Sequence, residues 1–155
     1  MENEKMNLED KDVIMFWNKI VLPFEREIKK TRGKVIFKHK RHFMLSPQQS
    51  QTIEKKYGIK IIPIEDNKQQ QNQFVFRDNQ IVLKTGQGYI YYNLFHHIRN
   101  AFTHVNIQKD NGFFYMEDWE NKQTKTLSAK IKIEDFEKYI DDIHHANAEY
   151  IKGKK

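Results

Sequence analysis

The sequence predicts a single α+β domain over residues 1–155, in which small antiparallel β-hairpins are added to a helical core. Three observations lead to this fold class. Apolar residues recur at helical spacing in three stretches, near residues 13–24, 91–105 and 136–143. Short runs of β-branched and aromatic residues flank turn-forming pairs such as Asn111-Gly112. Neither an internal repeat nor a domain boundary is visible in the sequence between these stretches.

The N-terminal half should contain two helices separated by an extended segment. Residues 8–30 carry apolar side chains at helical spacing, and Pro23 should kink or divide that helix because proline lacks a backbone N–H. An extended segment is expected over residues 34–45, where β-branched and aromatic residues are frequent. Ser46 and Pro47 should then form the N-cap and the first position of a short helix.

The rest of the chain should supply the hairpins and one more terminal helix. Residues 59–66 are expected at a sheet edge, because Pro63 cannot donate a ladder hydrogen bond. Residues 74–84 indicate a hairpin around an Asp-Asn pair, and residues 105–120 a second hairpin that turns at Asn-Gly. The alternating residues 127–133 should pair with this second hairpin, and an amphipathic helix should close the chain.

The composition indicates a cytoplasmic protein that meets polyanions. The net charge of +6 favours polyanionic partners, and the absence of cysteine excludes disulfides and thiolate metal ligands. The polar, acidic first residues predict that there is no signal peptide. Apolar stretches are far shorter than the ~20 residues of a membrane-spanning helix, so no membrane association is expected.

The stretch HHIRNAFTH, residues 96–104, contains three of the seven histidines and lies on the most strongly patterned helix. At about 100° per residue, an apolar stripe falls within roughly 60° of Ile98. Its other members are Tyr91, Leu94, Phe95, Ala101, Phe102 and Val105. The opposite face is polar but contains no Lys, Asp or Glu, which this chain uses freely elsewhere. Because histidine exchanges protons near neutral pH, this polar face is a candidate site.

Two other interpretations of this face stay open. The polar face of an amphipathic helix ordinarily contacts water and has no further role. The adjacent pairs His96–His97 and His144–His145 also raise the question of a zinc site. Neighbouring helical side chains point about 100° apart, however, and no His-Glu-x-x-His motif is present, so we expect neither a metal nor a cofactor.

The segment IRNAFTH resembles the motif of the HEPN superfamily, in which an arginine and a following polar residue precede a histidine on an amphipathic helix. Arg99, Asn100 and His104 match this motif, and Ile98 supplies the aliphatic residue before the arginine. The order of elements after the helix, a hairpin and then LSAKIKIEDFEKYIDDI, is similar to that of small bacterial HEPN proteins. The resemblance therefore implies a HEPN-like helical core with the hairpins added to it.

Two positions depart from the family pattern. The residue after the histidine is often glycine in the family, whereas this chain has Val105. The toxin branch has a tyrosine two residues after the histidine, whereas this chain has Asn106. Control by modification of that tyrosine is therefore not implied.

The resemblance implies a metal-independent endoribonuclease that leaves 2′,3′-cyclic phosphate ends. Arg99 would hold the phosphate, Asn100 would orient His104 or hydrogen-bond the phosphate, and His104 would act as general acid or base. His97, on the same flank as His104, would support the site. Because Arg99 and His104 lie about 140° apart around an ideal helix, the site would need two facing copies, and a homodimer is expected.

A second segment fits an RNA partner. Seven basic residues between positions 29 and 41 form a patch that would position the RNA backbone, namely Lys29, Lys30, Arg32, Lys34, Lys38, Lys40 and Arg41. The implied setting is a toxin pair or phage defence, in which an antitoxin or another regulatory partner would belong. The alternative is a non-catalytic HEPN-like module that binds nucleotide, RNA or a partner protein.

Overall fold

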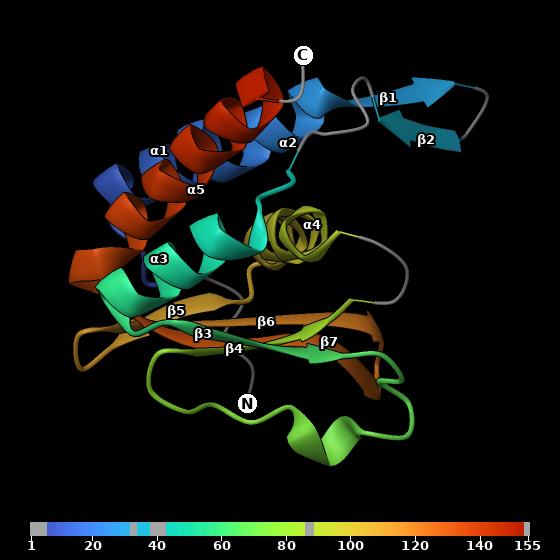
Figure 1. Cartoon of the computed structure of the whole chain (residues 1–155). Helices are drawn as coiled ribbons and strands as arrows, with labels where there is room; N and C mark the ends of the chain where they lie inside the picture. Colours follow the sequence, from blue (N-terminus) through green and yellow to red (C-terminus); the bar gives the residue numbers. More distant parts are fainter. Residues whose placement is uncertain (1–5, 32–33, 38–42, 86–88, 154–155) are drawn as a thin grey trace.

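The computed structural model describes residues 6–31, 34–37, 43–85 and 89–153, and its centre is a five-stranded mixed sheet (Figure 1). The strands follow one another across the sheet in the order β3 (Lys60–Ile64), β4 (Gln80–Lys84), β7 (Thr124–Lys132), β6 (Phe113–Asn121) and β5 (Ile107–Asp110). β3 pairs with β4 in parallel, and the remaining neighbours pair antiparallel. The strands thus form one continuous sheet that carries the helices.

The expected HEPN-like helical core with added hairpins is therefore wrong. Two pairings distant in sequence, β3 with β4 and β4 with β7, join the separate β-segments into the sheet, and local alternation does not reveal such partners. The hairpin expected over residues 74–84 is also absent, because only its second half is a strand. Phe74, from the expected first strand, instead packs with Ile64 and Val82 in a small separate core cluster.

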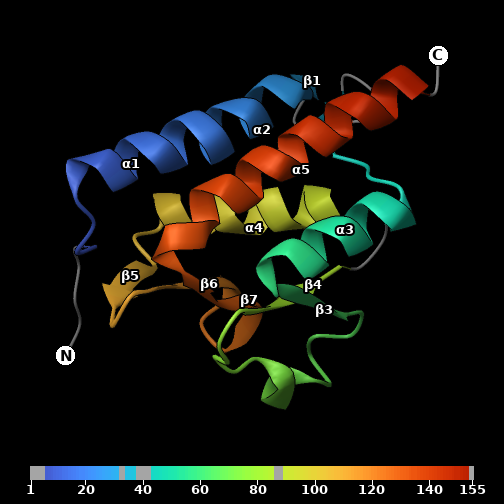
Figure 2. The same cartoon turned by 60° about the vertical axis from the view of Figure 1, so that its left-hand side comes forward.

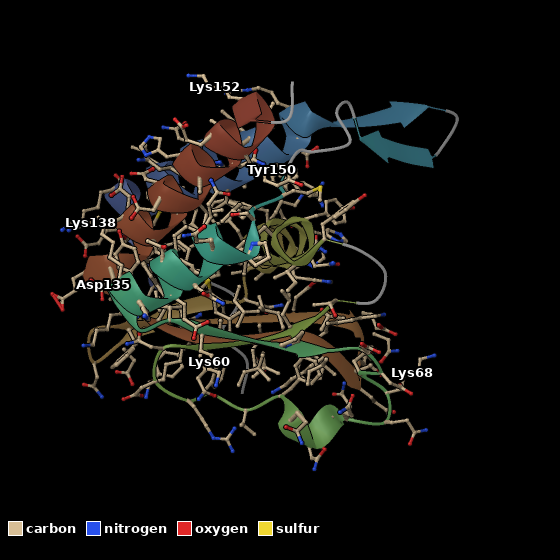
Figure 3. The ribbon with its side chains drawn as sticks, in the orientation of Figure 1. Lys60, Lys68, Asp135, Lys138, Tyr150 and Lys152 are labelled. Atoms are coloured by element: carbon tan, nitrogen blue, oxygen red, sulfur yellow. The ribbon has the colours of Figure 1, made fainter. Side chains whose placement is uncertain are left out.

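The α-helices form two layers on one side of the sheet, whereas the short 3-10 helix η2 (Gln71–Gln73) lies on the other side (Figures 1 and 2). α4 (Ile90–Thr103) lies against the sheet, and α3 (Pro47–Tyr57) packs next to α5 (Ile133–Gly153). The outer layer contains α5 and the N-terminal helical run of α1 (Asp10–Phe16), η1 (Trp17–Val21) and α2 (Leu22–Glu27). Lys138 and Lys152 mark the outer surface of α5, away from the sheet (Figure 3). α4 is consequently enclosed between the sheet and the outer helices.

The N-terminal run stays helical through Pro23, and its irregular turn precedes the proline. η1 is a π-helical turn, in which the N–H of Leu22 bonds the carbonyl of Trp17. Pro23 has no N–H to donate to the carbonyl of Lys19, four residues earlier. His144 of α5 takes this place, with Nε2 at 2.8 Å from that carbonyl oxygen. The helix therefore tolerates the proline because a side chain from another helix satisfies the released acceptor.

The basic segment is only partly described. β1 (Ile28–Thr31) and β2 (Lys34–Phe37) form an antiparallel hairpin beyond α2, where the sequence predicted that the helix would continue to residue 30. The backbones of Lys29, Lys30 and Lys34 belong to this hairpin. The other members of the predicted patch, Arg32, Lys38, Lys40 and Arg41, lie outside the described residues, as does much of the extended segment expected over 34–45.

Several local predictions are confirmed. Ser46 caps α3 and forms a reciprocal capping box with Gln49, and Pro47 is the first helical residue. Asn111 and Gly112 turn the β5–β6 hairpin with φ of 50° and 84°, the left-handed values that this tight turn requires. β7 pairs with β6 as expected, and α5 closes the chain. Among the described residues, none of the helices has the length and apolar character needed to cross a bilayer.

Candidate functional site

α4 presents the predicted apolar stripe to the core and one unexpected polar side chain with it. Tyr91, Leu94, Phe95, Ile98 and Ala101 are all buried, as their spacing predicts. His97, which the helical spacing assigns to a polar flank, is also buried, with only 8% of its surface exposed. The apolar stripe thus fixes how α4 lies on the sheet, and this orientation carries His97 into contact with a strand.

The partner of His97 is Asp118 on β6. The Nδ1 atom of His97 lies 2.7 Å from Oδ2 of Asp118, whose side chain is almost fully buried. The same carboxylate oxygen accepts hydrogen bonds from the Asn100 amide on α4, at 3.3 Å, and from the Thr126 hydroxyl on β7, at 3.1 Å. Side chains from one helix and one strand therefore converge on a single carboxylate of a second strand.

The charge state of Asp118 determines which nitrogen of His97 is free. Burial opposes ionisation of Asp118, but hydrogen bonds from His97, Asn100 and Thr126 outweigh it and lower the pKa of that carboxyl below its ordinary value. An ionised carboxylate only accepts hydrogen bonds, so Nδ1 of His97 must donate. In the neutral ring, Nε2 is consequently the nitrogen with a free lone pair.

His96 has a different environment although it is the next residue. Its ring stacks on Phe24, with centroids 5.6 Å apart and planes 1° apart, and on His97 at 4.7 Å. Burial lowers the pKa of His96 to about 4. His96 is therefore a neutral aromatic side chain at neutral pH and not a cation.

A cavity of about 520 Å³ lies beside this flank of α4. Its walls come from α4, from the end of β4 and from the β6–β7 pair. The lining side chains are Lys84, Thr85, Tyr92, Asn93, His96, His97, Asn100, Asp118, Trp119, Glu120 and Thr126. Lys84 and Glu120 form an ion pair at 2.9 Å, so the charges of these two lining side chains offset each other. The His97–Asp118 pair therefore borders a space large enough for a small ligand.

Arg99 lies on the other flank of α4 and connects to the same network. Its guanidinium forms a two-pronged ion pair with Glu25 of α2, in which Nε donates at 2.8 Å and Nη2 donates to the same oxygen. Nη1 donates to Oδ1 of Asn100 at 2.8 Å. A continuous chain of hydrogen bonds thus runs from Glu25 through Arg99, Asn100 and Asp118 to His97.

His104 lies apart from this network, at the C-terminal end of α4. The residue is exposed, and its backbone N–H bonds the carbonyl of Asn100 at 2.9 Å. Val105 follows with φ of 64°, and the N–H of Asn106 bonds the carbonyl of Ala101, as in a glycine-type helix end. Val105 therefore adopts a left-handed conformation, which glycine adopts at a lower steric cost. His104 does not line the cavity.

The predicted residues accordingly divide into two groups. Arg99, Asn100 and His97 belong to one network, whereas His104 is exposed to solvent one turn beyond Asn100. Sequence reasoning missed Asp118, Thr126 and the cavity wall. One signal was present, because Phe114, Met116 and Asp118 occupy alternate positions of β6, and the third places a carboxylate on the core face.

Two further comparisons, for a metal-binding cluster and for similar known proteins, assign no role to this site. Within the described ranges, no group of three or more His, Asp or Glu side chains is arranged to hold a metal ion. No family model, curated protein sequence or solved structure matches this chain. The resemblance to HEPN proteins therefore rests only on the motif from Arg99 to His104 and on the order of the elements that follow it.

Proposed function

We propose that the chain is a metal-independent endoribonuclease whose site is the polar side of α4. One observation carries this proposal. Arg99 and Asn100, the residues predicted to hold a phosphate, are hydrogen-bonded to each other, and Asn100 donates in turn to the Asp118 carboxylate that orients His97. The site therefore combines a phosphate-binding cation, an amide donor and a proton-transfer group, which are the components that RNA transesterification requires.

Arg99 keeps donors for a phosphate despite its ion pair. Of its five N–H groups, two bond Glu25 and one bonds Asn100, which leaves two. Its side chain is 24% exposed, and the guanidinium also lies 5.7 Å from the centre of the Phe24 ring. These contacts hold the guanidinium in one orientation before RNA binds, which lowers the entropic cost of placing it against the phosphate.

The reaction needs two proton-transfer groups. The 2′-hydroxyl gives its proton to a base and attacks the adjacent phosphorus, and the departing 5′-oxygen receives a proton from an acid. In this proposal the exposed His104 supplies one of them. A second copy of the chain in a homodimer would supply the other, or His97 of the same chain would do so. The oligomeric state of the active protein distinguishes these two sources.

A second candidate function follows from the Glu25–Arg99 ion pair. A carboxylate that occupies two donors of Arg99 competes with a phosphate for the same cation. If RNA does not displace Glu25, the α4 surface binds RNA or a nucleotide without cleaving it. The chain is then a binding module, and its cavity is the recognition element.

The deciding experiment is incubation of the wild-type protein with mixed-sequence RNA in excess chelator, followed by analysis of the RNA ends. The ribonuclease proposal expects 2′,3′-cyclic phosphate ends and a large loss of activity in both Arg99→Ala and His104→Ala. The matched control is Arg77→Ala, an exposed arginine on the loop that precedes β4. Intact RNA in the wild-type reaction, together with measurable RNA binding, would favour the binding module instead.

A further inference from the structure

The structure points to a ribonucleoside-binding site in the cavity beside α4. We propose that this cavity holds one nucleoside of an RNA chain and that Nε2 of His97 accepts a hydrogen bond from the ribose 2′-hydroxyl. The choice of RNA as ligand rests on the proposed function. The site itself is a separate claim, because a nucleotide can occupy the cavity whether or not the chain cleaves RNA.

The first argument is the shape and chemistry of the cavity. Its volume of about 520 Å³ falls within the range of about 300–1,000 Å³ that is typical of small-molecule sites. Tyr92 and Trp119 place aromatic rings in its wall, and such rings stack readily on nucleobases. The His96 ring also lines the wall but already stacks on Phe24 and His97, and because burial lowers its pKa it adds no positive charge at neutral pH.

A fixed amide adds a polar group to this aromatic wall. The Nδ2 atom of Asn93 donates to the carbonyls of Thr85 and Tyr89, each at 2.9 Å. These two bonds use both amide hydrogens and leave Oδ1 as an acceptor. A nucleobase with N–H groups on its edge can donate to such an oxygen, so the wall offers both stacking and hydrogen bonding.

The second argument is the orientation of His97. Its Nδ1 is engaged by Asp118 at 2.7 Å, and Asp118 is held in turn by Asn100 and Thr126. The ring therefore has one orientation, in which Nε2 is the nitrogen available to a ligand. Because His97 is 8% exposed and lines the cavity, a group that reaches Nε2 does so from the cavity. The unprotonated nitrogen of a neutral imidazole accepts a hydrogen bond, and a ligand hydroxyl can donate one.

The third argument is that this contact distinguishes RNA from DNA. Of the hydroxyls inside an RNA chain, the 2′-hydroxyl alone is missing from DNA. If the bound RNA is cleaved, Nε2 of His97 takes the 2′-hydroxyl proton, and the 2′-oxygen bonds to phosphorus. The phosphorus to 5′-oxygen bond then breaks, and the 5′-oxygen takes a proton from an acid outside the cavity, the role that the proposed function gives to the exposed His104. The products are a 2′,3′-cyclic phosphate and a 5′-hydroxyl. Proton exchange with the buffer then returns both histidines to their starting protonation states.

The test uses ligands that cannot be cleaved. The full chain, labelled with ¹⁵N, is titrated with ribonucleoside 3′-monophosphates, with their 2′-deoxy counterparts and with inorganic phosphate, while the histidine ring signals are followed by NMR. We expect the ribonucleotides to shift the His97 Nε2 signal and to bind about 10-fold more tightly than the deoxy forms, the value of one good hydrogen bond. His97→Gln and Asp118→Asn should each abolish this preference, whereas His145→Gln, an exposed histidine of α5, should retain it.

The outcomes separate this inference from the proposed function. Equal affinity for ribo- and deoxynucleotides, or a preference that survives in His97→Gln, overturns the cavity site even if the wild type cleaves RNA. A ribonucleotide preference that depends on His97 supports the site even if the wild type leaves RNA intact. The comparison of ligands on the wild type needs no variant, so poor folding of Asp118→Asn does not affect it.

Discussion

The chain contains two adjacent histidine pairs, and the fold uses them in opposite ways. On α4, His97 bonds a buried carboxylate through Nδ1 and lines a cavity. On α5, His144 bonds the Lys19 carbonyl through Nε2 at 2.8 Å and packs on Phe95, with ring centroids 4.9 Å apart. The partner of His97 is a charged side chain beside a cavity, whereas the partner of His144 is a backbone acceptor that Pro23 leaves unsatisfied. The first arrangement leaves a histidine nitrogen available to a ligand, and the second satisfies a backbone carbonyl in an irregular helix.

The difference shows that the role of an adjacent histidine pair cannot be predicted from the pair alone. Both pairs occur on amphipathic helices and have the same spacing. Their roles are set by what the neighbouring element offers, a strand carboxylate for α4 and an irregular helical turn for α5. Neither pair belongs to a metal cluster among the residues that the structure describes.

If the chain cleaves RNA as proposed, the largest expected difference between the two histidine pairs is in the cleavage rate. His97→Gln should lower the cleavage rate at least about 100-fold, because a positioned base typically contributes that much. His144→Gln should leave the rate within about 2-fold, because glutamine can still donate to the Lys19 carbonyl. Rates measured with one fluorogenic RNA at saturating substrate provide the comparison. Equal losses in the two variants would remove the distinction between a chemical and a structural pair.

The next effect is on folding stability. Asp118→Asn should lower the free energy of unfolding by roughly 1–3 kcal/mol, because an amide cannot accept from His97, Asn100 and Thr126 as the carboxylate does. His144→Leu should cost about 1 kcal/mol, because it leaves one partly buried carbonyl without its donor. Urea denaturation at pH 7 with an unchanged slope measures both values. A larger loss in His144→Leu than in Asp118→Asn would show that the α5 pair is the more important one for the fold.

Local features of the fold were predictable from the sequence, but the sheet was not. The cap at Ser46, the turn at Asn111 and Gly112 and the stripe on α4 each depend on residues close together in the chain. The pairing of β3 with β4 and of β4 with β7 depends on segments far apart, and alternation alone does not identify a partner. The helical core was therefore expected where a sheet forms.

For the candidate site, too, the residues on one helix were predictable, but their partners from distant segments were not. Helical spacing placed Arg99, Asn100 and His97 on one helix, and the structure joins them in one network. The same spacing does not show that Glu25 engages Arg99 or that Asp118 faces His97, since these partners lie 74 and 21 residues away. Acidic partners at such separations become visible only when the helices and strands are packed.

The smallest expected effect is the pH dependence of stability that His96 creates. Its pKa in the folded chain is about 4, below the ordinary value of 6.5, because burial disfavours the charged ring. Between these two values the unfolded chain binds a proton that the folded chain does not, so stability falls as the pH falls through this window. Solvent screening of this partly exposed ring limits the loss to about 1 kcal/mol between pH 7 and pH 4. His96→Phe keeps an aromatic ring against Phe24 and removes the titration, so its stability should fall less across that range in urea denaturation. His145→Gln, the exposed counterpart on α5, should reproduce the wild-type pH profile, and a His96→Phe profile that also matches the wild type would assign the pH dependence to other groups.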